Sequence, residues 1–469
     1  MRDLSSTSHR AHARDPSDGA VPPTRPALTG PVPTGAARTS PADHRAWLGL
    51  LAGDAAADLL EAALAADGAA LDSWSVRQVH ARPGAEVTVA YDVVAAREVD
   101  GRPVRAAEHL FATSARASAF HRARGGRDGD LGPGVVRLDD GERTVHVWRH
   151  PYDPALPGLA AGSTPDRVAE RLRAAGVDAP LLSLETVTYR PLRRAVLRAR
   201  TTAGAAYVKV VRPTRVEALV RRHALFAARP GGTSGVAAPR VRSWSADGVV
   251  LLDEVPGESV AGLLARTSAR DQPACIDPAE LLRVATALPR AGLALPRRPA
   301  WADRSAHYLG ALATVHGVDA ARLAALHEAI DAVVAEGDPG PLVVTHGDLH
   351  AANLLLEPAA RAGDRPSVGA VLDVDTLGPG HLVDDLACAV AHLAVLPALD
   401  PGAYAGVDGL VERCLDVFGR AVEPALLRAR AAAVVVSLAA GAEDAATVGE
   451  FLAVAERLAD RHAAQAAGV

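Results

Sequence analysis

The spacing of hydrophobic and polar positions changes along the chain, and each change predicts a different kind of element. Between Trp47 and Ala63 apolar residues recur at steps of three and four, the period of an amphipathic helix. Over 76–94 they alternate instead, with a break at Arg82-Pro83-Gly84. Alternation on both sides of a turn signal predicts two antiparallel strands. Residues 108–115 are expected to add a third strand.

The same three-strand pattern recurs over residues 184–211, where Arg190-Pro191 takes the place that Arg82-Pro83 holds in the first copy. We therefore predict an internal repeat of a small β-sheet. Chance similarity between two short hairpins is the alternative. The copies differ in chemistry, because only the second has a lysine, Lys209, in its third strand.

A buried strand is expected within 248–259, and the pattern then becomes helical almost to the end of the chain. The helical period is interrupted once, by a β-rich island that includes residues 342–358 and 367–380. The expected helices cover 260–267, 278–291, 303–315, 320–335, 382–396, 403–420, 423–441 and 443–465.

Charge and composition exclude several classes of protein. The 469 residues contain 50 basic and 55 acidic side chains, so no overall positive field attracts nucleic acid or an anionic membrane. No stretch of 18 apolar residues is free of charge, Gly or Pro, and the N-terminal residues lack the apolar core of a signal peptide. The three cysteines show no CxxC spacing, which disfavours disulfides and zinc. We expect a cytoplasmic protein without nucleic-acid or membrane partners.

Two residue types are almost absent: Lys209 is the single lysine, and Asn353 is the single asparagine. Arginine replaces lysine elsewhere, yet its planar guanidinium differs from a compact ammonium. A site that holds an ammonium beside phosphates cannot accept that exchange. Asparagine at a Mg²⁺ ligand position likewise cannot become Asp without added charge. Both residues are therefore candidates for a functional site.

The chemistry-bearing residues concentrate in the β-rich island. His346-Gly347-Asp348 follows a predicted strand, Asn353 lies five residues after Asp348, and Asp373 ends the next strand. Phosphoryl transfer requires a carboxylate that orients the attacking hydroxyl, oxygen ligands for Mg²⁺ and a cation on the nucleotide phosphates. Asp348, Asn353, Asp373 and Lys209 meet these needs. Turn and helix-cap roles are the alternative for Asp and Asn.

The order and spacing of these residues resemble the catalytic loop and metal-binding segment of protein kinases. The stretch HGDLHxxN, a strand that ends in LDxD, and the later DDLA over 384–387 resemble the aminoglycoside phosphotransferase and choline kinase family. The resemblance covers residues 184–440. It implies an α+β fold with two lobes, a small β-sheet lobe that binds ATP and a larger helical lobe with a catalytic hairpin.

The resemblance also implies the role of each residue. Asp348 would be the catalytic base, Asn353 and Asp373 would bind Mg²⁺, and Lys209 would contact the α- and β-phosphates of ATP. The adenine would lie against the backbone around Glu254 and Val255. The N-terminal extension and the segment HPYDPALPGLA are similar to cap-bearing actinobacterial sugar kinases such as maltokinases.

The sequence departs from the family pattern in three places. The turn Arg190–Arg194 replaces a glycine-rich loop, so Arg193 and Arg194 are candidates for phosphate binding, with a solvated basic turn as the alternative. Either Glu217 or His223 would support Lys209. Asp375 would be a metal or substrate ligand, or a hydrogen-bonded turn residue.

These expectations divide the chain into a disordered tail (1–43), an N-terminal α/β cap subdomain (44–180), an ATP-binding β lobe with its hinge (181–257) and a helical catalytic and substrate lobe (258–469). The expected activity is ATP- and Mg²⁺-dependent transfer of the γ-phosphate to a hydroxyl of a sugar, an amino sugar or a related alcohol. An aminoglycoside-modifying resistance kinase and a nucleotide-binding pseudokinase are the alternatives. The sequence leaves open the acceptor, the choice of ATP or GTP, the role of the cap, and whether the protein is a monomer or a homodimer.

Overall fold

The computed structural model describes residues 41–81, 86–125, 131–227, 236–268, 276–357, 366–442 and 444–460. Contacts divide the chain into two compact units. The β unit comprises residues 1–218 and 241–254, and the helical unit comprises residues 219–240 and 255–469. The expected tail therefore lies outside the described residues except at its end, where a helix already begins at Pro41.

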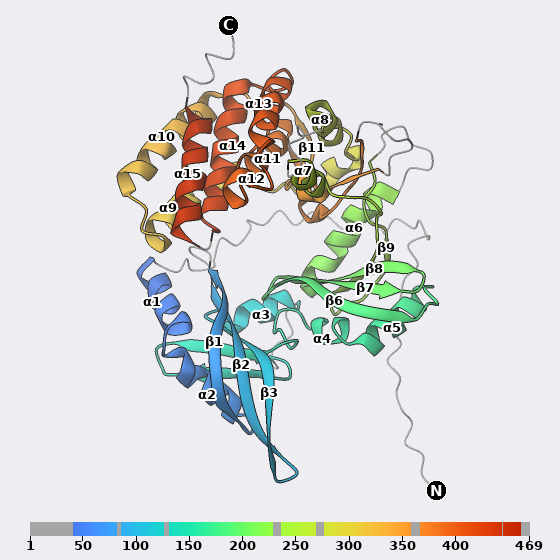
Figure 1. Cartoon of the computed structure of the whole chain (residues 1–469), viewed down its shortest axis with the longest axis vertical. Helices are drawn as coiled ribbons and strands as arrows, with labels where there is room; N and C mark the ends of the chain where they lie inside the picture. Colours follow the sequence, from blue (N-terminus) through green and yellow to red (C-terminus); the bar gives the residue numbers. More distant parts are fainter. Residues whose placement is uncertain are drawn as a thin grey trace, which may run out of the picture. The chain divides into compact units, whose positions relative to one another are not determined.

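The β unit contains two five-stranded sheets (Figure 1). The first has the strand order β1-β2-β3-β5-β4, and its neighbouring strands are antiparallel. Its core is formed by β-branched and leucine side chains of the strands together with helices α1 and α2. The elements of this part are α1 (Pro41–Ala52), α2 (Ala56–Ala65), β1 (Ala69–Ala81), β2 (Val87–Val99), β3 (Arg102–Thr113), α3 (Ala117–Ala123), β4 (Val135–Asp139) and β5 (Thr144–Arg149).

The second sheet has the order β6-β7-β8-β10-β9, so it repeats the topology of the first. A helix follows the third strand in each sheet, α3 in one and α6 in the other. The predicted repeat is thus confirmed at the level of strand order. The elements are α4 (Leu159–Gly162), α5 (Pro165–Ala174), β6 (Leu181–Arg190), β7 (Arg194–Thr201), β8 (Gly204–Val211), η1 (Pro213–Arg215), α6 (Val216–Ala227), β9 (Val241–Trp244) and β10 (Val249–Asp253).

The register shows which residue replaces the lysine in the first sheet. Thr88 and Val196 each stand six residues after the arginine of their Arg-Pro pair. Val196 lies opposite Lys209, and Thr88 lies opposite Thr113. Thr88 and Thr113 are buried, and their hydroxyls form a 2.8 Å hydrogen bond. The first sheet therefore holds a neutral, internally satisfied pair at the position where the second sheet carries a cation.

The helical unit follows the expected sequence of helices closely. Helices α14 and α15 lie side by side, and α14 also contacts α11 in the core (Figure 1). The elements are α7 (Val260–Ser268), α8 (Pro278–Thr286), η2 (Arg290–Ala294), η3 (Ala302–Arg304), α9 (Ser305–Val315), α10 (Ala320–Glu336), α11 (Leu382–Ala394), α12 (Leu396–Leu399), α13 (Val407–Phe418), α14 (Pro424–Ala439) and α15 (Ala445–Ala459).

The β-rich island forms two small antiparallel sheets in the helical unit, where the sequence predicted one hairpin. β11 (Leu342–Thr345) pairs with β14 (Gly378–His381), and β12 (Leu354–Leu356) pairs with β13 (Val368–Val371). The short helices η4 (Ala351–Asn353) and η5 (Val374–Thr376) lie in the connections. These two connections contain Asp348, Asn353 and Asp373.

The run Leu382–Leu399, which covers α11 and α12, is long and apolar enough to cross a membrane by length and composition alone. Most side chains of α11 lie in the core of the helical unit. Its first turn also contains Asp384 and Asp385, and Asp385 is fully buried. These contacts are those of a core helix in a globular unit.

Candidate functional site

The two connecting segments of the β-rich island are joined directly by hydrogen bonds. The imidazole Nε2 of His346 donates to the carbonyl of Leu372 at 2.8 Å. The amide of Leu372 donates to the carbonyl of Asn353 at 2.8 Å. Since Asp373 follows Leu372, these bonds bring together Asn353 and Asp373, the two residues predicted to bind Mg²⁺.

The side-chain amide of Asn353 has a defined orientation. Its Nδ2 lies 3.0 Å from the backbone carbonyl of Asp348 and 3.0 Å from Nε2 of His350. A carbonyl oxygen only accepts, so the nitrogen of the amide must face it. Both amide protons are then used within the loop. The oxygen Oδ1 is the atom that remains for a metal ion.

The same contact fixes the state of His350. Its Nε2 accepts from Asn353, which requires a neutral ring with the proton on Nδ1. Burial lowers the pKa of His350, although the carboxylates of Asp348 and Asp373 raise it. The carboxylate of Asp348 lies 4.0 Å from His350 Nε2 and keeps 27% of its side chain exposed. Asp348 is thus accessible while its loop is fixed.

His350 stacks on a second histidine from α11. The ring centroids of His350 and His392 are 4.4 Å apart, and the rings are nearly parallel. Burial lowers the pKa of His392 to about 3, with a smaller contribution from His350. Both rings are therefore neutral near pH 7.

Asp373 adopts a left-handed backbone conformation, with φ 53° and ψ 50°. Aspartate tolerates this region better than most residues, but a side chain there still carries strain of the order of 1 kcal/mol. Asp373 lies two residues after the end of β13 and is the N-cap residue of η5. The local fold therefore keeps a carboxylate at a position where glycine would be less strained.

A buried carboxylate from α11 anchors the segment that precedes Asp348. Asp385 accepts hydrogen bonds from the amides of His346 and Gly347 at 2.7 and 2.8 Å. Burial raises the pKa of Asp385 to about 7, although the two amides lower it. The preceding residue, Asp384, forms a capping box with His381 at the start of α11, whereas Asp385 supports the loop.

Three further contacts position the same loop. Gly347 has φ +77°, and a Cβ there would lie 3.1 Å from Cβ of Thr376. This packing explains why glycine stands where protein kinases have arginine. The Thr376 hydroxyl donates to the His346 carbonyl at 2.8 Å, and the indole of Trp301 donates to the Gly347 carbonyl at 3.0 Å. No signal in the sequence linked Trp301 to this loop.

In the β unit, Lys209 lies in the middle of the second sheet. It is paired in register with Val196 on one side and Val250 on the other, and only 5% of it is exposed. On β10, Glu254 follows the last strand residue, and its carboxylate accepts from Arg198 at 2.6 Å. Val255, the other residue expected beside the adenine, is the first residue of the returning helical unit.

The turn that replaces a glycine-rich loop is anchored by a buried aspartate. Asp153 accepts from the Leu192 amide at 2.7 Å and from the Tyr189 hydroxyl at 2.8 Å. The Leu192 carbonyl accepts from Nε of Arg212 at 2.6 Å. Burial raises the pKa of Asp153, and these donors lower it. The turn therefore reaches a fixed shape without glycine, with Leu192 at φ 62°.

The remaining predicted residues lie in and beside the turn before β7, in α6 and in η5. Arg193 lies in the anchored turn, 4.0 Å from Glu86, and Arg194 begins β7. Glu217 lies exposed in the first turn of α6. His223, the alternative to Glu217, is buried and donates from Nδ1 to the Pro239 carbonyl at 2.7 Å. Asp375 lies in η5, and its carbonyl accepts from Arg298 at 3.1 Å.

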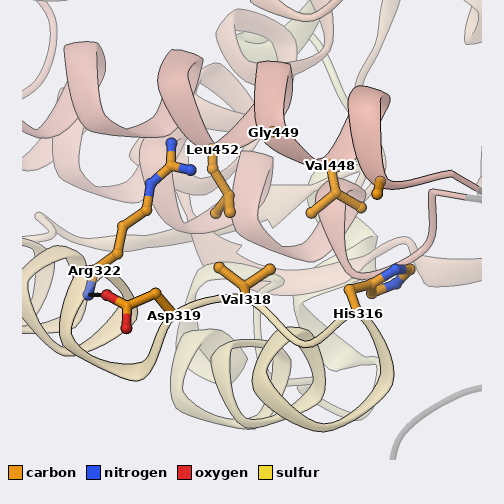
Figure 2. A pocket seen from close by; sticks show the side chains of 8 residues that line it. His316, Val318, Asp319, Arg322, Val448, Gly449 and Leu452 are labelled. Atoms are coloured by element: carbon orange, nitrogen blue, oxygen red, sulfur yellow. Dashed lines mark hydrogen bonds between the residues drawn. The ribbon is translucent and has the colours of Figure 1, made fainter.

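A separate cavity of about 230 Å³ lies in the helical unit, where the start of α10 faces α15 (Figure 2). Val318, Val448 and Leu452 form its apolar wall, and Arg322 lies at its edge, paired with Glu456. None of the residues that line it belongs to the predicted catalytic or metal-binding set. The cavity is therefore separate from the loop segments that contain Asp348, Asn353 and Asp373.

Comparison with known proteins identifies a related family. The profile of the phosphotransferase enzyme family (APH) matches residues 192–431, just over half of the chain. This range includes Lys209, both segments of the β-rich island and α11. No curated protein matches the chain by sequence.

Two solved structures are similar to the chain. The macrolide 2'-phosphotransferase MphH from Brachybacterium faecium is 21% identical, with 62% of this chain and 97% of that chain covered and a TM-score of 0.33. The aminoglycoside phosphotransferase APH(3'')-Id from Streptomyces rimosus is 20% identical, with 63% and 99% covered and a TM-score of 0.34. At these TM-scores the likeness carries no argument about substrate, and the family assignment rests on the profile match.

Proposed function

The chain belongs to the phosphotransferase enzyme family, and we propose that it is an ATP- and Mg²⁺-dependent kinase that phosphorylates a hydroxyl of a sugar, an amino sugar or a related alcohol. One observation carries this proposal. The carbonyl of Asp348 holds the amide of Asn353, and the carbonyl of Asn353 holds the residue before Asp373. One hydrogen-bonded chain thus joins the three groups that phosphoryl transfer needs in the helical unit.

Asp348 is the proposed catalytic base. Its carboxylate is partly exposed, so an acceptor hydroxyl can reach it. As the bond from the acceptor oxygen to the γ-phosphorus forms and the bond to ADP breaks, the hydroxyl proton passes to Asp348. His350 stays neutral in this arrangement because its Nε2 accepts a hydrogen bond from the Asn353 amide. A neutral His350 forms no ion pair with the Asp348 carboxylate, which stays available to take the hydroxyl proton.

Asn353 and Asp373 are the proposed Mg²⁺ ligands. Mg²⁺ prefers oxygen ligands, and the Asn353 amide is oriented so that its oxygen is the atom available. A bound Mg²⁺ would neutralise charge on the nucleotide phosphates. Asp373 adds a carboxylate to the same pair of segments. The residues present therefore fit the ion.

In the β unit, we assign the nucleotide phosphates to Lys209, with Arg193 and Arg194 as additional contacts. Lys209 is the single lysine of the chain and is almost fully buried in the second sheet. Glu217 is its proposed support, and the backbone at Glu254 and Val255 is the proposed adenine contact. The first sheet, with Thr113 at the lysine position, is proposed to be a cap that does not bind nucleotide.

An ADP-release screen tests the function. The full chain would be incubated with ATP, with and without Mg²⁺, and with panels of sugars, amino sugars and aminoglycosides. We expect Mg²⁺-dependent ADP release with a sugar or amino sugar, and loss of that release in Asp348→Asn and Lys209→Arg. Asp319→Asn is a matched control, because it changes a carboxylate that caps α10 to an equally good cap.

The other outcomes separate the alternatives. ADP release with aminoglycosides alone would identify a resistance kinase instead of a sugar kinase. A thermal shift with ATP and no ADP release with any acceptor would favour a pseudokinase. Full activity in Asp348→Asn would refute the proposed base. Sedimentation of the same preparation would show whether the enzyme is a monomer or a homodimer. We also propose that it acts in the cytoplasm.

A further inference from the structure

Asp348 belongs to a second cluster of side chains, separate from the Asn353 and Asp373 pair. One ligand atom each from Asp348, Cys388 and His392 lie within 4.8 Å of one another. Cys388 and His392 are four residues apart on α11, so they share one face of the helix. That face presents a sulfur and an imidazole to the catalytic carboxylate.

The ligand types differ from those of the Mg²⁺ pair. Asn353 and Asp373 offer oxygens only, whereas this cluster combines a thiol, a neutral imidazole and a carboxylate. Sulfur and imidazole ligands select zinc and related transition metals over Mg²⁺. Three protein ligands with a fourth position for water are a common zinc arrangement. The chemistry of the cluster is therefore that of a softer metal.

The geometry is close to what a tetrahedral ion needs. Bonds of about 2.0–2.3 Å place ligand atoms roughly 3.3–3.8 Å apart, so a separation at the 4.8 Å limit would have to shorten by about 1.0–1.5 Å. Side-chain rotations can supply this change, because all three groups lie beyond a rotatable bond. The partly exposed Asp348 gives an ion access from solvent.

Groups around the cluster act on two of its ligands. Burial raises the pKa of the Cys388 thiol well above its usual value, and the Asp348 and Asp385 carboxylates raise it further, whereas a hydrogen bond with the Leu349 backbone lowers it. A divalent cation must therefore displace the thiol proton as it binds. The neutral ring of His392 stacks on His350, which fixes the plane of the ring. The cluster thus has outer contacts that orient its sulfur and its imidazole.

We propose that Asp348, Cys388 and His392 form a binding site for Zn²⁺ or a related thiophilic divalent metal, and that a bound metal inhibits the kinase by occupying Asp348. Binding replaces the thiol proton of Cys388, which passes to solvent, and transfers no electron. The inhibitory part rests on the proposed role of Asp348 as the base. The binding part does not depend on any activity.

Cobalt titration tests binding directly, because a Co²⁺–thiolate bond gives a charge-transfer band in the near ultraviolet. We expect the metal-free full chain to bind one Co²⁺ with this band, and Zn²⁺ to displace it. Cys388→Ala should abolish the band, and Asp348→Asn and His392→Phe should weaken affinity on the order of 100-fold. Phenylalanine keeps a ring stacked on His350. Cys414→Ala is the matched control, since Cys414 is an equally buried helical cysteine outside the cluster.

An absent band, or a band that persists in Cys388→Ala, would overturn the site. If the wild type shows the band and Asp348→Asn binds Co²⁺ more weakly but keeps full kinase activity, the metal site stands and the proposed base is refuted. In a Mg²⁺-saturated assay, Zn²⁺ should inhibit the wild type, and Cys388→Ala should require at least about tenfold more Zn²⁺ for half-inhibition of its own activity. Equal sensitivity of the two proteins would refute the inhibitory role.

Discussion

Asn353 donates its side-chain amide to the backbone carbonyl of Asp348 at 3.0 Å, so the proposed metal ligand holds the proposed base in place. The contact explains why this position keeps the single asparagine of the chain. A carboxylate has the same shape, but it presents an oxygen to the carbonyl and to Nε2 of His350. The contact with the Asp348 carbonyl would then become repulsive, and His350 would have to place its proton on Nε2 to keep the other contact.

Asn353→Asp changes few atoms, but we expect it to lower both the stability of the protein and its affinity for Mg²⁺. The loss of two donors should destabilise the protein by about 1–3 kcal/mol, and displacement of the loop should weaken the apparent Mg²⁺ affinity at least about tenfold. Thermal denaturation and the Mg²⁺ dependence of ADP release would measure both effects. Ala352→Asp adds the same charge at the exposed neighbouring residue and should retain activity. Equal behaviour of the two variants would contradict the orienting role of Asn353.

Asp373 separates backbone strain from chemistry. Because its φ is 53°, Asp373→Gly should relieve strain, and the glycine variant should be more stable than Asp373→Ala by about 1 kcal/mol. Both variants lack the carboxylate, so both should lose Mg²⁺-dependent ADP release. Chemical denaturation and the kinase assay give the two readouts. An active glycine variant would show that the carboxylate does not bind the metal.

Removal of the Asp385 carboxylate should lower kcat, although Asp385 is not proposed to contact the substrate. In Asp385→Ala the His346 and Gly347 amides lose their buried acceptors, at a cost of about 1–3 kcal/mol each. The loop should shift, so kcat should fall more than the KM for ATP changes. Asp444→Ala removes an exposed N-cap of α15 and is expected to cost about 1 kcal/mol with no change in kcat. A parallel result for both variants would mean that Asp385 is only a helix cap.

The loop that contains Asp348 and Asn353 could be recognised from sequence because its residue spacing is local. Asp348 and Asn353 lie five residues apart on one connection, and short spacing is what a sequence motif records. The alternation of strands was also local, which is why three strands were expected in each copy of the repeated sheet, although β1 begins at Ala69 and β3 at Arg102, earlier than the alternation indicated. The substitution of Thr113 for lysine needed the register of the strands, which relates residues distant in sequence.

The parts that the sequence did not predict depend on distant partners. Asp385 lies in the first turn of an apolar helix, where acidic residues are common, and its two amide partners lie on another segment. β14 has the sequence Gly-Pro-Gly-His, which has little strand propensity; it is a strand because β11 pairs with it. Gly380 fits there because Thr345 leaves no room for a Cβ. Such tertiary pairings override local preference.

The partly buried His392 makes the free energy of unfolding depend on pH in a specific way. Its pKa is about 3 in the folded protein and 6.5 in the unfolded chain, so between these values the unfolded state binds more protons. The free energy of unfolding therefore falls as the pH drops below 6.5, by about 1.4 kcal/mol per pH unit from this group, and His392 contributes no slope at higher pH. His392→Phe should remove this slope, while Cys388→Ala on the same helix should retain it. Denaturant titrations between about pH 4.5 and pH 7.5 would measure the difference between variant and wild type. Parallel curves for His392→Phe and the wild type would show that folding does not lower the pKa of this imidazole.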